Sequence, residues 1–181
     1  MSNQPVQPVL YLVVCAAPPA RQVGELVQLL MDDRWNVCVI ATPTAVTWID
    51  CDTLTQQTGF PVRCKFRRPD NVDPLPKADV VVVAPATFNT INKWATGIND
   101  SLALGILNET LGLGLPILAS PYAKPALTQH PAYPGHVEML TTAGVTFTRP
   151  EAIRPQHEGN PFRWGLIRDA VARFHPSSPP T

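Results

Sequence analysis

Short continuous runs of apolar residues recur along the chain, separated by more polar segments. A run with no polar alternation indicates a strand that is buried on both faces, as in a parallel sheet covered by helices. The run at Asp79–Ala84 contains four consecutive valines and is the clearest of them. A sixth, weaker segment at Val62–Phe66 is predicted as a short edge strand. The other predicted strands are Val9–Cys15, Asn36–Ala41, Leu115–Ser120 and Val145–Thr148.

Between these runs the apolar residues return with the period of an amphipathic helix. We predict helices over Ala20–Asp33 and around His136–Thr142, a weaker helix or turn over Val46–Leu54, and a C-terminal helix with Ile167 and Val171 on its apolar face. A long stripe predicts one continuous helix ended by two glycines. Its members are Ile91, Trp94, Ala95, Ile98, Leu102 and Ile106, with Gly112 and Gly114 at the end.

Strands that alternate with helices imply right-handed crossovers and a parallel sheet. The predicted fold class is therefore α/β: a three-layer, Rossmann-like or flavodoxin-like domain with an open parallel sheet. A chain of 181 residues is long enough for one hydrophobic core. We expect a single domain over residues 1–175, followed by a disordered tail rich in proline and serine at 176–181.

Charge and hydropathy exclude several partners. The net charge is zero and only 15% of the residues are charged, so neither nucleic acid nor a membrane surface is an expected partner. A basic cluster at Arg63, Lys65, Arg67 and Arg68 lacks interleaved aromatic residues apart from Phe66 and is interpreted as a solvated edge. No apolar run has the length of a membrane span, and the N-terminus lacks a basic signal region. The expected location is the cytoplasm.

Four cysteines, Cys15, Cys38, Cys51 and Cys64, match neither a zinc motif nor a CxxC redox pair. Free thiols are the expectation, and no metal site is predicted.

Three predicted strands end in small and hydroxylated residues. These segments are Cys15-Ala16-Ala17, Thr42-Pro43-Thr44 and Pro85–Thr90. Small side chains let a ligand approach the backbone, hydroxyl groups and the Asn89 amide can hydrogen-bond it, and a helix N-terminus favours an anion. The combination suits a phosphate, with ordinary helix caps and turns as the alternative. Neither a P-loop lysine motif nor a GxGxxG motif is present.

The segment from Ala84 to Asp100 resembles the "APxSANTxAKxAxGxxDNLL" signature of the flavin-containing cysteine decarboxylases. That family includes phosphopantothenoylcysteine decarboxylase and the enzymes that oxidatively decarboxylate the C-terminal cysteine of lantibiotic precursors. The resemblance covers roughly Val9–Thr148 in element order. The matching positions are Asn89, Thr90, Lys93, Gly97 and Asp100.

The resemblance implies FMN as the cofactor. Cys15, Ala16 and Ala17 replace the family's Gly-Ser turn at the FMN phosphate, so that contact departs from the family pattern. The resemblance places Thr42 and Thr44 near the FMN phosphate and Trp48 near the flavin ring. The alternative for Trp48 is a partly buried helix residue. The resemblance also implies that the flavin side of the pocket is formed by Ala86, Thr87 and Asn89.

Two departures from the family concern catalysis. The family's catalytic histidine precedes the strand at Asp79, but no histidine of this chain occurs before His130; Asp73 or Asn71 is the candidate replacement. A carboxylate at that place would repel a substrate carboxylate unless one of them were protonated. Of the "PxMNxxMW" signature only Pro121 survives, and Lys124 falls where the family has its substrate-gripping asparagine. Lys124 is either a partner for a substrate anion or a solvated loop lysine.

A third departure lies in the C-terminal segment Arg154–Asn160, which has no cysteine to return electrons to an oxidised intermediate. The resemblance therefore implies an FMN-dependent oxidative decarboxylase that stops at the oxidised enethiol and acts on a small-molecule or peptide cysteine substrate. Asn89, Asp73 and Lys124 are its candidate catalytic residues. The alternative is an FMN-binding protein without decarboxylase activity, such as a flavin carrier or redox partner. A flavin prenyltransferase is a third, less favoured hypothesis. The low charge of the chain favours association between copies. Members of the family bind their flavin between subunits, so the resemblance implies a homo-oligomer built on trimers.

Overall fold

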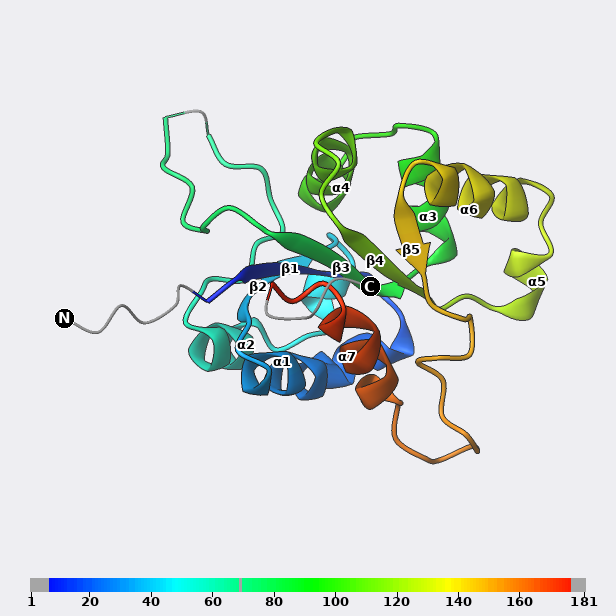
Figure 1. Ribbon diagram of the computed structural model, residues 1–181, viewed down its shortest axis with the longest axis horizontal. Helices are drawn as coiled ribbons and strands as arrows, with labels where there is room; N and C mark the ends of the chain where they lie inside the picture. The colour runs from blue at the N-terminus through cyan, green and yellow to red at the C-terminus, as the bar shows by residue number, and fades with distance from the viewer. Residues whose placement is uncertain (1–6, 69, 177–181) are drawn as a thin grey trace.

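The structure, a computed structural model, describes residues 7–68 and 70–176. Most of the predicted disordered tail lies outside these residues. Five parallel strands form one open sheet in the order β2-β1-β3-β4-β5, as Figure 1 shows. The strands are β1 (Val9–Val14), β2 (Asn36–Ala41), β3 (Val80–Ala86), β4 (Ile117–Pro121) and β5 (Val145–Phe147).

Helices connect the strands and cover both faces of the sheet (Figure 1). Helices α1, α2 and α7 share one hydrophobic core with the sheet, and α3, α4 and α6 share the other. This is the predicted three-layer α/β architecture. The α-helices are α1 (Val23–Asp32), α2 (Cys51–Thr58), α3 (Phe88–Ala95), α4 (Leu102–Gly112), α5 (Pro125–Thr128), α6 (Ala132–Thr142) and α7 (Trp164–Ala172), and the 3-10 helices are η1 (Pro18–Gln22) and η2 (Ala45–Thr47).

The five main strand predictions are confirmed, with ends that differ by two residues at most. The prediction of an edge strand at Val62–Phe66 is wrong. That segment makes one parallel bridge between Arg63 and Ile40 of β2. Beyond this bridge the segment runs along the loop that carries Asp73, with which Arg63 and Arg67 form ion pairs.

The prediction of one long helix through Ile91 and Ile106 is also wrong. The structure divides this stretch into α3 and α4, and Gly97 between them has a φ of 72°. Glycine adopts this left-handed conformation without a steric penalty and so commonly ends a helix. Ile98, counted in the predicted stripe, is consequently 42% exposed.

A tyrosine anchors the loop between α2 and β3 to the sheet. The Tyr11 hydroxyl of β1 donates a hydrogen bond to the Pro76 carbonyl oxygen at 2.7 Å. Burial, with a smaller contribution from Asp73, raises the pKa of Tyr11 from 10.0 to about 12. The folded protein therefore holds this proton more tightly than the unfolded chain does.

The Tyr11→Phe variant is expected to lose about 1 kcal/mol of unfolding free energy at neutral pH, because the Pro76 carbonyl loses its partner. A raised pKa stabilises the fold fully below pH 10, and this contribution disappears as the pH rises towards 12. Urea unfolding across that range should show the gap between wild type and variant narrowing. A gap that widens with pH would contradict the assignment.

The four cysteines are free thiols, as expected. Within residues 7–68 and 70–176, no cluster of histidine, cysteine and carboxylate side chains is arranged to hold a metal ion. In the same part of the chain no helix is long and apolar enough to cross a membrane.

Candidate functional site

The strand order places a switch point between β1 and β3. The chain moves from β1 to its neighbour β2 on one side, and from β3 to β4 on the other, so the crossovers diverge at this point. In open α/β sheets ligands bind at the carboxyl ends of the strands beside such a switch point. Two backbone bonds join the turns that meet here: Cys15 N–H donates to the Pro85 carbonyl at 3.2 Å, and Thr42 N–H to that of Val14 at 3.0 Å.

The turn after β1 is formed by Cys15, Ala16 and Ala17. Cys15 and Ala17 are buried, and Ala16 is half-buried. Burial raises the pKa of the Cys15 thiol above its usual value, although hydrogen bonds involving Thr90 and Thr87 partly oppose this. The thiol is therefore protonated at neutral pH and fills space below the turn rather than acting as a nucleophile.

The turn after β2 carries two hydroxyl groups and an aromatic ring. The Thr42 hydroxyl accepts a hydrogen bond from Ala45 N–H at 3.3 Å, and the backbone then continues into η2. Thr44 is exposed, and its hydroxyl has no partner among the described residues. Trp48, directly after η2, is 39% exposed, which is unusual for so large an apolar side chain.

The N-terminus of α3 forms the third side of the site. Thr87 caps the helix: its side chain accepts from Thr90 N–H at 3.4 Å. Ala86 is fully buried and lies directly before the cap. Asn89 in the first helical turn is exposed, and no hydrogen bond to its amide is formed within the described chain. Its donor and acceptor groups are thus available to a ligand.

The segment after β4 brings cationic groups to the same edge of the sheet. Lys124 is exposed and precedes α5. Arg154, from the loop before α7, stacks on the Tyr122 ring at 4.3 Å and donates to the Ala123 carbonyl at 2.5 Å. These contacts hold the 149–163 loop against the β4 end. The sequence prediction included Lys124 but not Arg154. No sequence pattern indicates that the loop carrying Arg154 packs on Tyr122.

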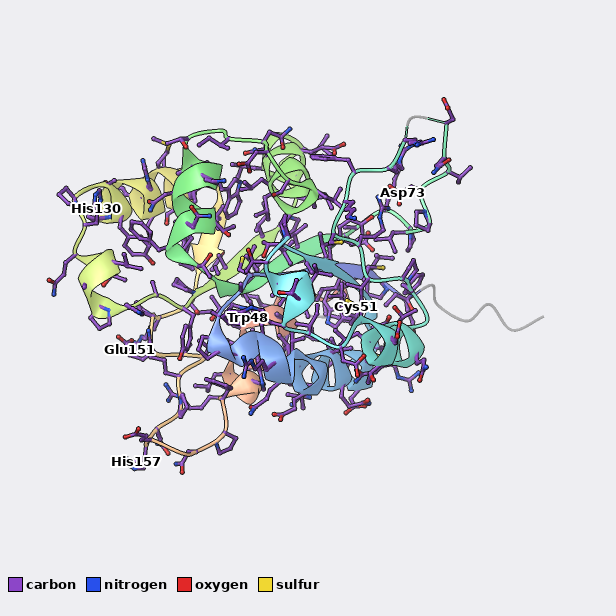
Figure 2. The ribbon with its side chains drawn as sticks, turned by 180° about the vertical axis from the view of Figure 1, so that it is seen from behind. Trp48, Cys51, Asp73, His130, Glu151 and His157 are labelled. Atoms are coloured by element: carbon purple, nitrogen blue, oxygen red, sulfur yellow. The ribbon has the colours of Figure 1, made fainter. Side chains whose placement is uncertain are left out.

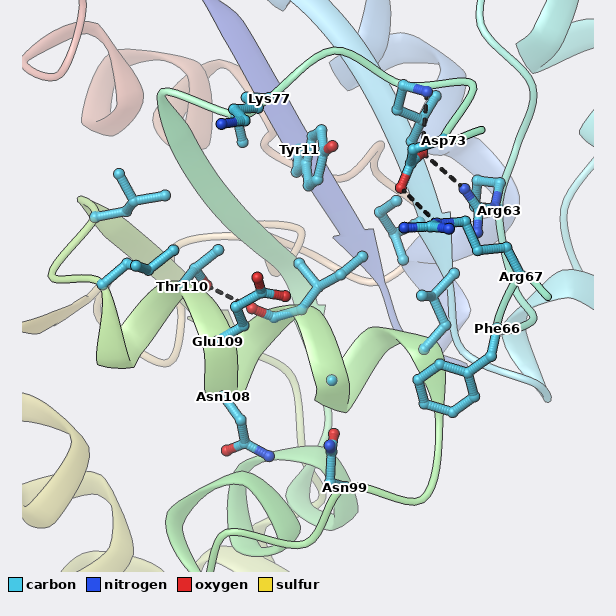
Figure 3. A pocket seen from close by; sticks show the side chains of 18 residues that line it. Tyr11, Arg63, Phe66, Arg67, Asp73, Lys77, Asn99, Asn108, Glu109 and Thr110 are labelled. Atoms are coloured by element: carbon cyan, nitrogen blue, oxygen red, sulfur yellow. Dashed lines mark hydrogen bonds and ion pairs between the residues drawn. The ribbon is translucent and has the colours of Figure 1, made fainter. Parts of the chain in front are cut away.

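Asp73 lies away from the other predicted site residues. Figure 2 shows it on the loop that projects from one side of the molecule, whereas Trp48 lies near the middle. Its carboxylate pairs with Arg63 at 3.0 Å and Arg67 at 3.6 Å. Asp73 lines a groove of about 1030 Å³ between this loop, β1 and α4 (Figure 3), and none of the other predicted site residues lines that groove.

Sequence reasoning missed two further residues at the strand ends. Arg21 in η1 lies over the Trp48 ring, with 5.5 Å between the guanidinium carbon and the ring centroid. His130 makes an edge contact with Phe88, the residue before Asn89, at 5.8 Å between ring centroids. The sequence gives no signal for the position of Arg21, since its contact with Trp48 joins two turns that are far apart in the chain.

The strand order and the covering helices define an open α/β protein of flavodoxin-like topology, with a switch point between β1 and β3. The family described as Flavoprotein matches residues 2–174, so the chain belongs to the Flavoprotein family.

Curated relatives match part of the chain. The coenzyme A biosynthesis bifunctional protein CoaBC of Thermococcus kodakarensis is 34% identical over 106 residues, which are 56% of this chain and 25% of that protein. CoaBC of Bacillus subtilis is 30% identical over 121 residues, 64% of this chain and 29% of that protein. The matched region thus spans only about a quarter of these two relatives.

Solved structures show the same fold over nearly the whole chain. A PPC decarboxylase mutant complexed with pantothenoylaminoethenethiol superposes with a TM-score of 0.75 at 21% identity, covering 93% of this chain and 98% of that one. The FMN binding protein AtHal3 gives 0.75 at 21% identity, with coverages of 96% and 100%. The FMN-dependent cysteine decarboxylase SpaF gives 0.70 at 21% identity, with coverages of 93% and 97%.

Proposed function

We propose that the chain binds FMN at the carboxyl ends of β1, β2 and β3. The observation that carries this proposal is the arrangement of three turns around the switch point. Two of these turns carry the Asn89 amide and the Thr44 hydroxyl, which have no partner among the described residues. Membership of the Flavoprotein family and the likeness to FMN-binding structures support it.

The residues at the switch point fit an FMN molecule. Ala16 is half-buried, and its small side chain lets a planar ring or a phosphate approach the backbone, while the small side chains of Ala17 and Ala86 pack beneath the surface of the site. The partly exposed Trp48 offers an aromatic face against which a flavin ring can pack. Thr42 and Thr44 supply hydroxyl groups for the phosphate, and Thr87 and Asn89 polar groups for the ring.

For the reaction we propose oxidative decarboxylation of a cysteine-like thiol carboxylate, including the C-terminal cysteine of a peptide. A bound flavin supplies the capacity to accept two electrons from such a substrate. Asn89 orients the reacting centre through its amide, and the Lys124 ammonium pairs with the substrate carboxylate. A relative described as a cysteine/cysteine sulfinic acid decarboxylase, 33% identical over 73 residues, supports this substrate class.

The reaction is tested by incubating the FMN-loaded protein with peptides that end in cysteine. Mass spectrometry should show the loss of about 46 Da, the mass of carbon dioxide and two hydrogens. The Lys124→Ala variant is expected to raise KM about 10-fold because the carboxylate loses its counter-charge. Lys77→Ala removes an exposed lysine from the separate groove and serves as the matched control. Peptides that keep their mass while the protein binds FMN would refute the reaction and leave the cofactor proposal intact.

A second candidate is FMN binding without decarboxylation, as in a flavin carrier or redox partner. The position of Asp73 favours it, since the proposed replacement for the family's histidine is paired with Arg63 and Arg67 in the groove. The peptide experiment separates the two candidates.

We also propose that the protein is a homo-oligomer built on trimers. The groove presents apolar side chains to solvent, among them Phe66 at 58% exposure. Light scattering should give a mass that is a multiple of three copies of the 19.7 kDa chain. A mass of one chain at micromolar concentration would contradict this.

A further inference from the structure

We propose that Arg21 binds the phosphate group of FMN and thereby selects FMN over riboflavin. This inference rests on the proposed function, since it assigns a residue to one part of that site. It follows from two observations: the turn after β1 has few free amide groups, and the guanidinium of Arg21 has no polar partner within residues 7–68 and 70–176.

The first observation concerns the backbone of the turn. Pro18 and Pro19 open η1 and have no N–H group. The N–H of Ala17 already donates to the Cys15 carbonyl at 2.9 Å, and that of Ala20 to the Ala17 carbonyl at 2.8 Å. Among residues 15–20 only Ala16 keeps an uncommitted N–H. A helix start normally offers several such donors to an anion, and this one does not.

The second observation concerns the side chain. Arg21 is exposed, and within the described ranges 7–68 and 70–176 its guanidinium makes no hydrogen bond and no ion pair. By contrast, Arg63 pairs with Asp73 and Arg168 with Asp33. The Arg21 guanidinium instead lies over the Trp48 ring. This stacking restricts the side chain while leaving its planar N–H groups free, which is the geometry that matches two phosphate oxygens.

Position connects the two observations. Arg21 follows β1, Trp48 follows β2, and these two strands are neighbours in the sheet. The contact between the two side chains therefore bridges the turns on which Ala16 and Thr44 lie. A phosphate dianion taken from water needs compensating charge as well as hydrogen bonds. The guanidinium of Arg21 provides this charge and also the hydrogen-bond donors that the proline-containing turn lacks.

Riboflavin has the same ring and side chain as FMN but no phosphate, so the assignment predicts a difference between the two ligands. The Arg21→Ala variant should bind FMN about 10- to 100-fold more weakly, because a charge-assisted pair is lost. Its riboflavin affinity should equal that of the wild type. The Arg21→Lys variant keeps the charge without the planar fork and should lie between the two for FMN.

The experiment is a fluorescence titration of each ligand at low and high salt. Arg34→Gly is the matched control: it removes the same charge from the turn before β2, at the opposite end of that strand, where φ is 69° and glycine fits without strain. The control should bind both ligands like the wild type. FMN affinity should fall with salt in the wild type and hardly at all in Arg21→Ala.

Each outcome separates the inference from the proposed function. If Arg21→Ala binds FMN as tightly as the wild type does, Arg21 is not a phosphate ligand, and the flavin site remains. If Arg21→Ala loses riboflavin and FMN equally while Arg21→Lys restores neither, the residue supports the fold or the ring and the phosphate assignment is wrong. If the wild type binds neither ligand, both proposals are wrong.

Discussion

The Asn89→Asp variant is expected to bind FMN about 100-fold more weakly than the wild type. The substitution preserves the shape of the side chain but replaces the amide donor by a carboxylate, which only accepts hydrogen bonds. It also places a negative charge beside an anionic cofactor. Since Asn89 is exposed and has no partner within the described residues, the change breaks no contact of the fold.

The fold should in fact tolerate this variant well. Asn89 lies in the first turn of α3, where a negative charge interacts favourably with the helix dipole. Thermal unfolding in the absence of flavin should therefore match or slightly exceed that of the wild type. Asn99→Asp makes the same change at an exposed position before α4 and should leave FMN affinity unaltered. Equal FMN affinity in Asn89→Asp and Asn99→Asp would remove Asn89 from the site.

The Trp94→Ala variant is expected to lose about 3–5 kcal/mol of unfolding free energy. Trp94 is 2% exposed and belongs to the same buried cluster as residues of α6 and β3. It thereby anchors α3, the helix that Thr87 caps and that carries Asn89. A loss of this size is a large part of the stability of an ordinary domain. Urea unfolding measures it directly, and saturating FMN should restore part of the lost stability if the cofactor binds the folded state alone.

The Trp94→Phe variant is the matched comparison. The indole N–H of Trp94 has no hydrogen-bond partner in the described part of the chain, so its removal breaks no polar contact. Phenylalanine should therefore cost only about 1–2 kcal/mol, through the smaller volume it fills. Equal losses in the two variants would contradict the assignment of this stability to the volume that the ring fills.

The strands β1 to β4 were predictable because nearly all their residues are buried, which leaves an unbroken apolar run in the sequence. β2 was predicted with its observed ends, and β3 extends the predicted run by Pro85 and Ala86. For helices the apolar pattern alone does not show where one helix ends and the next begins. The stripe from Ile91 to Ile106 keeps helical spacing across Gly97, and no periodicity shows that this glycine adopts a left-handed conformation.

The candidate site was predictable where it depends on a strand end. Ala86 ends β3, while Cys15, Thr42 and Thr87 directly follow their strands, and parallel strands bring such residues to one edge. Asp73 lies in a long loop, where partners far along the sequence decide the position, here Arg63 and Arg67. Arg21 was missed for a similar reason, since its place depends on a contact with Trp48 across two turns.

The central claim is that the carboxyl ends of β1, β2 and β3 bind a flavin mononucleotide, and a spectroscopic titration tests it most directly. The purified protein should either carry flavin already, with absorption peaks at about 370 and 450 nm, or take up one FMN per chain, and this uptake should quench the fluorescence of the FMN. Asn89→Asp should reduce that uptake, and Asn99→Asp should not. A colourless protein whose addition leaves the fluorescence of FMN unchanged at micromolar concentrations would contradict the account.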